Sequence, residues 1–540
     1  MHMLLIQPPI EDFYQTGIRL QPVGLAYLKA TIKKFFPQVK VTLRDYHLGY
    51  GKRTVARPGE LAFLNDYYRV PDRSPFSTFH HYYRFGANIE TIVRDVARLN
   101  PDLVGISSLF TAYLPQALQV AKAIRERLKI PVLLGGSHVS ADPLGVLAEP
   151  FVDFVIRGEG EKAVTFFIEE WLGKKQWHKV PNLGFKDQAG ALRLNPLEPN
   201  FAIDELPFPD LSDFDPHAYR LGRDPLSFII SSRSCPYHCQ FCSVHQTFGR
   251  TFRLRSVENI LQELQLRVAQ GYRVFDFEDD NFTFDLERIR ALNSALRREL
   301  PVESVRLMAM NGVAYFRLDA EILSGMFEAG FRDLNLSLVS TNQKLMRQLK
   351  RPLHLQRFLD VVEHAFKLGM RVTAYQILGL PGESSESMIE TLQFLSALPV
   401  VIGVSPFYLT PGMPISSRVK SPLPAWVAGR LTSLGATSSP EEREIIYTLF
   451  IIARIVNFLK SIKITEQKVT LNELLEEKEM WKGRDAIGRE ILVRLIKGKG
   501  MFGFDGYDFV PLPRFRRDVF GHFHNNVQFI RRMDGGRIYF

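Results

Sequence analysis

Segments with the pattern of β-strands and segments with the pattern of α-helices alternate twice along this chain. In the first series, short apolar runs typical of buried strands occur at Leu4–Gln7, Val39–Arg44, Val104–Ser107, Val132–Leu134 and Asp153–Ile156. Helical spacing of apolar residues falls between them, at Gly24–Phe35 and Leu114–Leu128. Strands that alternate with helices of this length predict a parallel, doubly wound sheet of the Rossmann-like type.

The second series begins near Ser227, after a linker rich in Pro and Asp at Asp204–Pro216. Its six strand-like runs are Phe228–Ser231, Val274–Phe277, Val305–Met308, Leu334–Leu338, Arg371–Ile377 and Ile402–Tyr408. Six such units predict a partial (β/α)6 barrel rather than a full eightfold one. The predicted domains are therefore an α/β domain over 1–200, a linker over 201–225, the barrel over 226–415 and a mainly helical C-terminal domain over 416–540.

Composition and charge exclude several other classes of protein. The 540 residues are 46% hydrophobic and 23% charged, which excludes disordered and collagen-like chains. The net charge of +10 favours an anionic ligand only weakly, and we predict no nucleic-acid partner. The most apolar stretch, Ile445–Ile462, is interrupted by Arg454 and Lys460, and no export signal is evident. We expect a cytoplasmic protein, with peripheral membrane contact as a further option.

All three cysteines of the chain fall within eight residues, in Cys235-Pro-Tyr-His-Cys239-Gln-Phe-Cys242. A disulfide framework would need an even number of cysteines spread along the chain. Thiolates hold iron–sulfur clusters, usually four of them, so three on one loop would leave one iron open. The alternative is a structural zinc site completed by His238 or His245.

The cysteine spacing, its place after the first barrel strand and the aromatic Phe241 resemble the radical S-adenosylmethionine (SAM) superfamily. The resemblance implies a [4Fe–4S] cluster whose open iron binds the amino and carboxylate groups of SAM. It also implies an external electron donor, such as flavodoxin or ferredoxin, because reduction of the cluster cleaves SAM to a 5′-deoxyadenosyl radical. The chemistry then belongs to the cofactors, so we name no catalytic acid, base or nucleophile.

Further motifs at the ends of the predicted barrel strands resemble SAM-binding motifs of that superfamily. The SAM contacts that the resemblance implies are Phe241, Asp280, Asn311, Ser337, Ser340, Gln376 and Gly379. Asp279 is the alternative to Asp280, and a turn or a helix cap is the other explanation for Asp and Asn at these places. The chain departs from the pattern at Val339, where many relatives carry a glutamate.

Three motifs in the N-terminal part resemble the cobalamin-binding domain of cobalamin-dependent radical enzymes. They are Pro101–Ser108, Gly135–His138 and Arg157–Glu161, at the carboxyl ends of predicted parallel strands, where open sheets bind ligands. The cobalamin contacts that they imply are Ser107, Ser108, Gly135, Gly136, His138, Gly158, Glu159 and Gly160. A Rossmann-like domain with ordinary glycine turns is the alternative. The loop after the first strand, Pro8–Thr16, holds no histidine, so we expect no axial histidine from that motif.

The resemblance predicts a radical SAM enzyme that methylates an unactivated carbon by way of methylcobalamin. Two alternatives stay open: a cyclase, rearranging or carbon–carbon coupling enzyme without methyl transfer, and a non-catalytic iron–sulfur or zinc sensor. The high Phe content and the positive charge favour a hydrophobic or anionic small-molecule substrate, such as a lipid, isoprenoid or tetrapyrrole. We expect residues 416–540 to pack on the barrel and cap it.

Overall fold

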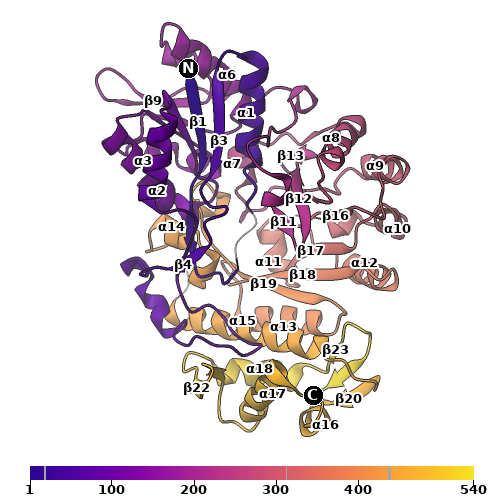
Figure 1. The fold of residues 1–540 in the computed structure, drawn as a ribbon. Helices are drawn as coiled ribbons and strands as arrows, with labels where there is room; N and C mark the ends of the chain where they lie inside the picture. Colours follow the sequence, from indigo (N-terminus) through magenta and orange to yellow (C-terminus); the bar gives the residue numbers. More distant parts are fainter. Residues whose placement is uncertain (17–19, 312, 436–438) are drawn as a thin grey trace.

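The N-terminal domain is built on a seven-stranded sheet in this computed structural model, which describes all residues except 17–19, 312 and 436–438 (Figure 1). The strand order is β10-β9-β8-β7-β6-β1-β3, and the five strands from β3 to β8 run parallel. The strands are β1 (His2–Gln7), β3 (Lys40–Asp45), β6 (Leu103–Ser107), β7 (Val132–Gly135), β8 (Phe154–Ile156), β9 (Leu183–Lys186) and β10 (Leu192–Leu194). This order reverses direction between β1 and β6, and doubly wound sheets bind ligands at such a switch point.

Helices cover both faces of this sheet, which explains why its inner strands are largely apolar. Met3 and Leu5 pack under α1 (Val23–Phe35) and α6 (Glu161–Leu172). Leu4 and Ile6 point the other way and pack under α2 (Ile89–Leu99) and α3 (Leu114–Leu128). A sheet buried on both faces is typical of parallel α/β domains, and the prediction of such a domain is confirmed.

The six predicted strands of the second series are present and run parallel in chain order. They are β12 (Asp224–Ile229), β15 (Val274–Phe277), β16 (Arg306–Met308), β17 (Asp333–Val339), β18 (Arg371–Leu378) and β19 (Val401–Pro406). The ladder is interrupted between β16 and β17, where only isolated bridges such as Leu307–Phe331 connect the two sheets. The strands thus form two sheets, and their closure into a partial barrel stays a prediction.

Helices alternate with these strands. They are α8 (Val257–Ala269), α9 (Leu286–Glu299), α10 (Ala320–Glu328), α11 (Gln343–Gln348), α12 (Leu355–Lys367) and α13 (Ser385–Ser396). Figure 1 shows α8, α9, α10 and α12 on the side turned away from the N-terminal sheet. The inner side of the strands therefore faces the N-terminal domain.

The long helix α15 (Pro440–Ser461) covers the edge strand β19. The Asn457 side chain accepts a hydrogen bond from the Ile402 amide and donates one to the Ile402 carbonyl, both at 2.8 Å. These two bonds satisfy backbone groups that an edge strand would otherwise leave unpaired. No helix in the described part of the chain is long and apolar enough to cross a membrane.

The C-terminal region contains short strands as well as the predicted helices. The helices after α15 are α16 (Leu471–Glu476), α17 (Gly483–Ile496) and α18 (Arg517–Asn526), and the strands are β20 (Lys468–Thr470), β21 (Phe502–Phe504), β22 (Phe509–Pro511), β23 (Phe529–Arg531) and β24 (Arg537–Tyr539). An aromatic excursion of the N-terminal domain, residues 51–88, packs on this region. The Tyr68 hydroxyl donates to the Thr432 carbonyl at 2.6 Å, and Phe76 contacts Phe458. The excursion thus ties the first domain to the last.

Candidate functional site

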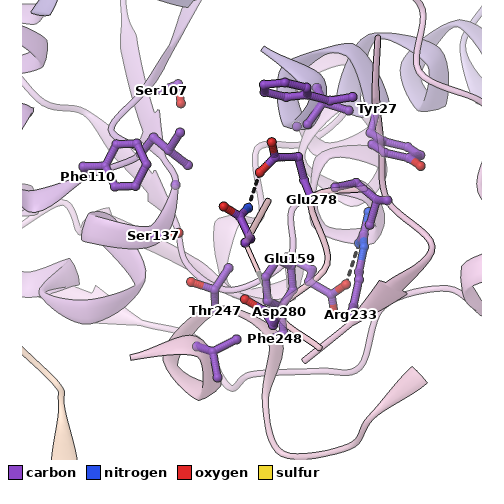
Figure 2. A pocket seen from close by; sticks show the side chains of 18 of the residues that line it. Tyr27, Ser107, Phe110, Ser137, Glu159, Arg233, Thr247, Phe248, Glu278 and Asp280 are labelled. Atoms are coloured by element: carbon purple, nitrogen blue, oxygen red, sulfur yellow. Dashed lines mark hydrogen bonds and ion pairs between the residues drawn. The ribbon is translucent and has the colours of Figure 1, made fainter. Parts of the chain in front are cut away.

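A cavity of about 1050 Å³ lies between the two α/β domains. One wall comes from the carboxyl ends of β1, β6, β7 and β8, and the other from the loops that follow β12, β15 and β16. Figure 2 shows Ser107, Phe110 and Ser137 on one side of the cavity, with Glu278 and Asp280 across from them. The cavity therefore lies where each domain, by its topology, is expected to bind ligands.

The cysteine loop follows β12 and lines this cavity with all three thiols. Neighbouring loops hold it by its backbone: the Gln240 amide donates to the Leu349 carbonyl at 2.9 Å, and the Ile415 amide donates to the Gln240 carbonyl at 3.0 Å. Polar side chains approach two of the sulfurs. The Asn281 Nδ2 lies 3.6 Å from the Cys235 Sγ, and the Arg351 Nη1 lies 4.0 Å from the Cys239 Sγ.

Two observations bear on whether the thiols hold a cluster or a zinc ion. Among the described residues, no three Cys, His, Asp or Glu side chains converge closely enough to hold a single metal ion. His245 cannot readily complete a zinc site, because its ring nitrogens face the carbonyls of Gly249 (2.9 Å) and Tyr237 (2.8 Å). Three thiols spaced around a cavity fit a larger iron–sulfur cluster, with one iron left for a substrate-like ligand.

Burial affects the protonation of two of these thiols, Cys235 and Cys242. It raises the pKa of Cys235, and it raises the pKa of Cys242 to about 12. Without metal both side chains therefore stay protonated at neutral pH. Iron binding has to displace those protons, as it does at other thiolate sites.

Of the two adjacent carboxylates after β15, Asp280 lines the cavity and Asp279 does not. Asp279 is only 1% exposed and accepts hydrogen bonds from the hydroxyls of Ser231, at 3.0 Å, and Ser232. Burial and the neighbouring Asp279 raise the pKa of Asp280 to about 7. A cationic ligand group beside Asp280 would restore its charge, which fits the ammonium group of SAM.

The other predicted SAM contacts divide into two groups. Phe241, Asn311 and Ser337 line the cavity. The cavity lining does not include Ser340, Gln376 or Gly379, because each contacts a partner behind the wall. The Ser340 hydroxyl donates to Glu383 at 2.7 Å, and the Gln376 side-chain amide donates to the Met388 carbonyl at 2.8 Å. The Gly379 backbone amide faces the Met388 sulfur at 3.1 Å. Only the first group can touch a ligand in this cavity as the structure stands.

Among the polar residues of this wall that sequence reasoning missed are Glu278 and Arg351. Glu278 lines the cavity and accepts a hydrogen bond from the Asn311 side chain. Arg351 lines it from the loop after α11 and donates to the Ser337 carbonyl at 2.9 Å. Glu278 stood in the same acidic run as Asp280, so the run could have suggested it. Nothing in the sequence marks Arg351, which only the fold brings to the cysteines.

Val339, which replaces the glutamate of many relatives, occupies an unusual backbone position. Its φ is +77°, and the register between β17 and β18 shifts between Ser337 and Val339. A β-branched residue rarely adopts this left-handed conformation. The bulge buries Val339 completely in the core, so this position offers the cavity no polar group.

On the opposite wall, six of the eight predicted cobalamin contacts line the cavity: Ser107, Gly135, Gly136, Gly158, Glu159 and Gly160. Ser108 and His138 lie behind this wall. A Cβ at Gly136, whose φ is +115°, would come within 2.6 Å of the Ser108 carbonyl, so glycine is required there. The His138 ring is 2% exposed, and its Nδ1 lies 3.0 Å from the Thr111 hydroxyl.

This wall fits a large flat ligand such as cobalamin. It offers backbone, hydroxyls and apolar side chains, and the described lining residues include no histidine. That cobalamin takes no axial histidine from the loop after β1 stays a prediction. The arrangement supplies shape and space rather than a metal ligand.

Buried ion pairs join the two walls at one end of the cavity. Arg233, two residues before Cys235, contacts Glu159 at 2.5 Å and Glu161 at 2.6 Å (Figure 2). Arg253 contacts Glu159 at 2.6 Å as well. Burial alone would raise the pKa of Glu161, but Arg233 outweighs it and holds the pKa below its usual value. Glu159, a predicted cobalamin contact, thus also fixes the cysteine loop against the N-terminal domain.

Comparisons with known protein families find a match for the domain behind each wall of the cavity. Residues 229–395 match the family described as the radical SAM superfamily, and residues 78–167 match the B12 binding domain. The chain is 27% identical to cytidylyl-2-hydroxyethylphosphonate methyltransferase from Streptomyces wedmorensis over 68% of this chain and 71% of that protein. It is 25% identical to hopanoid C-3 methylase from Methylococcus capsulatus over 58% and 60% of the two chains.

A solved structure shares the fold over nearly the whole chain. It is the cobalamin-dependent S-adenosylmethionine radical enzyme OxsB with aqua-cobalamin and S-adenosylmethionine bound. The TM-score is 0.60 at 15% sequence identity, and the match covers 97% of this chain and 78% of the other. The likeness includes the C-terminal region, which neither family match reaches.

Proposed function

Because this chain belongs to the radical SAM superfamily and carries a B12-binding domain, we propose that it is a cobalamin-dependent methyltransferase acting on an unactivated carbon. The observation that carries the proposal is the shared cavity. It brings the three thiols of one domain and the ligand-binding edge of the other to the same space. Methyl transfer needs both cofactors within reach of one substrate, and a single cavity meets that need.

When bound, the cluster with SAM supplies radical chemistry and cobalamin supplies a methyl carrier. The residues of the chain bind and orient these groups. Cys235, Cys239 and Cys242 hold the cluster, and the Asp280 carboxylate receives the SAM ammonium group. Asn281 and Arg351 direct N–H groups at two of the thiolate sulfurs, which orients the ligands and stabilises their negative charge.

The walls of the cavity exclude water from the reacting groups. Apolar side chains from both domains line it, among them Tyr27, Phe110, Phe228 and Phe248. This lining supports a hydrophobic small molecule, such as a lipid, isoprenoid or tetrapyrrole, as substrate. We further propose that the six parallel strands form a partial barrel, that the domains divide at 1–200, 226–415 and 416–540, and that the protein works in the cytoplasm.

The proposal predicts two products of SAM in one reaction. Anaerobic enzyme loaded with iron, sulfide and cobalamin is incubated with SAM, a reductant and candidate substrates. A methyltransferase of this kind forms 5′-deoxyadenosine and S-adenosylhomocysteine together, and the formation of S-adenosylhomocysteine requires cobalamin. Formation of 5′-deoxyadenosine alone, unchanged when cobalamin is left out, would support the cyclase or coupling alternative instead.

A further inference from the structure

Three segments at or beside the cysteine loop contain no acidic residue. Residues 235–254, 340–354 and 405–424 hold no Asp or Glu, although the chain as a whole has 58 of them. The same segments hold eight basic residues: Arg250, Arg253, Lys344, Arg347, Lys350, Arg351, Arg418 and Lys420. Such a separation of charge is unusual for a chain in which both signs are otherwise mixed.

Five of these cations form a surface that we call the basic patch: Lys344, Arg347, Lys350, Arg418 and Lys420. All five are exposed. Lys344, Arg347 and Lys350 recur every third residue along and just after α11, while Leu345, Met346 and Leu349 are buried beneath them. None of the five forms an ion pair with any residue that the structure describes, whereas Arg253 pairs with Glu159.

The basic patch borders the backbone that connects two cluster ligands. Gln240, between Cys239 and Cys242, is hydrogen-bonded to Leu349 on one side and to Ile415 on the other. Lys350 follows Leu349 directly, and the Arg418 amide donates to the Ile415 carbonyl at 2.9 Å. Residues of the patch thus flank the cysteine loop on both sides. In Figure 1, α11 lies near the middle of the molecule, close to β17 and β18.

We propose that the basic patch is the docking site of a small acidic protein that delivers electrons to the cluster. Unpaired charges of one sign raise the local potential and steer partners of the opposite sign. The Gln240 backbone then offers a covalent route from the surface to Cys239 and Cys242. One electron leaves the donor and enters the cluster, so the donor is oxidised, the cluster is reduced, and no bond forms or breaks. This inference rests on the proposed function, because it assumes a cluster on the three thiols.

The test compares a protein donor with a chemical one on the cluster-loaded enzyme. We replace Lys350→Glu and Arg418→Glu together, since neither side chain lines the cavity. The matched control is Lys174→Glu with Lys179→Glu, two exposed lysines of the N-terminal domain that give the same change in charge. Reduction of the cluster is followed by its absorbance, first with a reduced acidic flavodoxin and then with dithionite. Binding of oxidised flavodoxin is measured by calorimetry.

In low salt we expect the patch variant to lose at least about tenfold in the rate of reduction by flavodoxin and in flavodoxin affinity. Dithionite should reduce the patch variant at the wild-type rate, and the control variant should behave as wild type with both donors. High salt should narrow the difference between the patch variant and wild type in reduction by flavodoxin. Equal rates and equal affinities for the patch variant and wild type would overturn the docking site. Failure of wild-type enzyme to hold a cluster, or to cleave SAM with dithionite, would instead refute the proposed function.

Discussion

The two walls of the central cavity are built from different chemistry. The N-terminal wall presents hydroxyls, glycine backbone and apolar side chains, and its one carboxylate pair, Glu159 and Glu161, is bound by arginine. The wall of the radical domain presents three thiols and Asp280, whose pKa is raised by the surrounding protein and by the neighbouring Asp279 carboxylate. The carboxylates of the first wall already have arginine partners, whereas the thiols and Asp280 of the second are groups that a ligand would complete.

This difference assigns the two walls different tasks. The N-terminal wall binds mainly by shape, so a substitution that changes its shape should weaken cobalamin binding and leave the cluster in place. A wall of thiols and carboxylate binds by charge and coordination, so single substitutions there should remove its cofactor altogether. Substitutions on each wall can therefore separate the two tasks.

The largest effect is expected at the cysteines. Cys239→Ser removes a thiolate that no other cysteine in the chain can replace, so iron should fall from about four per chain to background. His238→Ala, next to it in sequence and exposed, is the control, because a zinc site would need a histidine and a three-thiolate cluster does not. Iron content and absorbance measure both variants. Loss of metal in the histidine variant would favour the zinc alternative.

On the opposite wall, Ser107→Trp should affect cobalamin alone. Ser107 ends β6 at the switch point and faces the cavity, so an indole there fills space that the ligand needs. We expect cobalamin affinity to fall at least about tenfold while the iron content is unchanged. Ser108→Ala, behind the wall, is the matched control. Simultaneous loss of iron and cobalamin in the Trp variant would mean that the walls do not act separately.

The ion pairs that join the walls are expected to matter for stability. Arg233→Met leaves Glu159 with one partner fewer and Glu161 without an arginine, both buried. Breaking a buried pair from one side costs about 3 to 5 kcal/mol of unfolding free energy. Denaturant unfolding measures it, with Arg98→Met as the control, since the Arg98 side chain is 76% exposed and its pair with Asp95 is on the surface. Equal losses for both variants would show that Arg233 is not a clamp.

A smaller, pH-dependent effect is expected behind the cavity, at the pair of Ser340 and Glu383. Burial raises the pKa of Glu383 from 4.5 to about 7. The folded protein therefore binds this proton more tightly than the unfolded chain, and the resulting stability is full below pH 4.5 and lost as the pH rises through 7. We compare the unfolding free energy of Glu383→Gln with that of wild type at two pH values. Between pH 4.5 and pH 8, the difference should change by about 2 to 3 kcal/mol in favour of the variant. A difference that does not change with pH would contradict this assignment.

The sequence predicted the helices, the strands and the place of the cysteine loop better than it predicted which single side chains reach the cavity. Periodicity located the parallel N-terminal strands, because a sheet buried on both faces needs apolar runs. Local motifs also singled out Asp280 and Ser107, which line the cavity, while their contacts with SAM and cobalamin stay predictions. Whether Ser340 or His138 also reaches the cavity depends on partners distant in sequence, Glu383 and Thr111, which no local pattern reveals. The position of Arg351 beside Cys239 and the ion pairs of Arg233 also depend on how distant loops and domains pack, which no local pattern reveals.

The most direct test of the two-wall account is the cofactor content of the whole chain. The protein is purified without oxygen, reconstituted with iron, sulfide and cobalamin, and freed of unbound cofactor before iron and cobalamin are counted. We predict about four irons and about one cobalamin per chain, both held at once. Four irons without cobalamin would contradict the account, because the N-terminal wall would then serve another purpose.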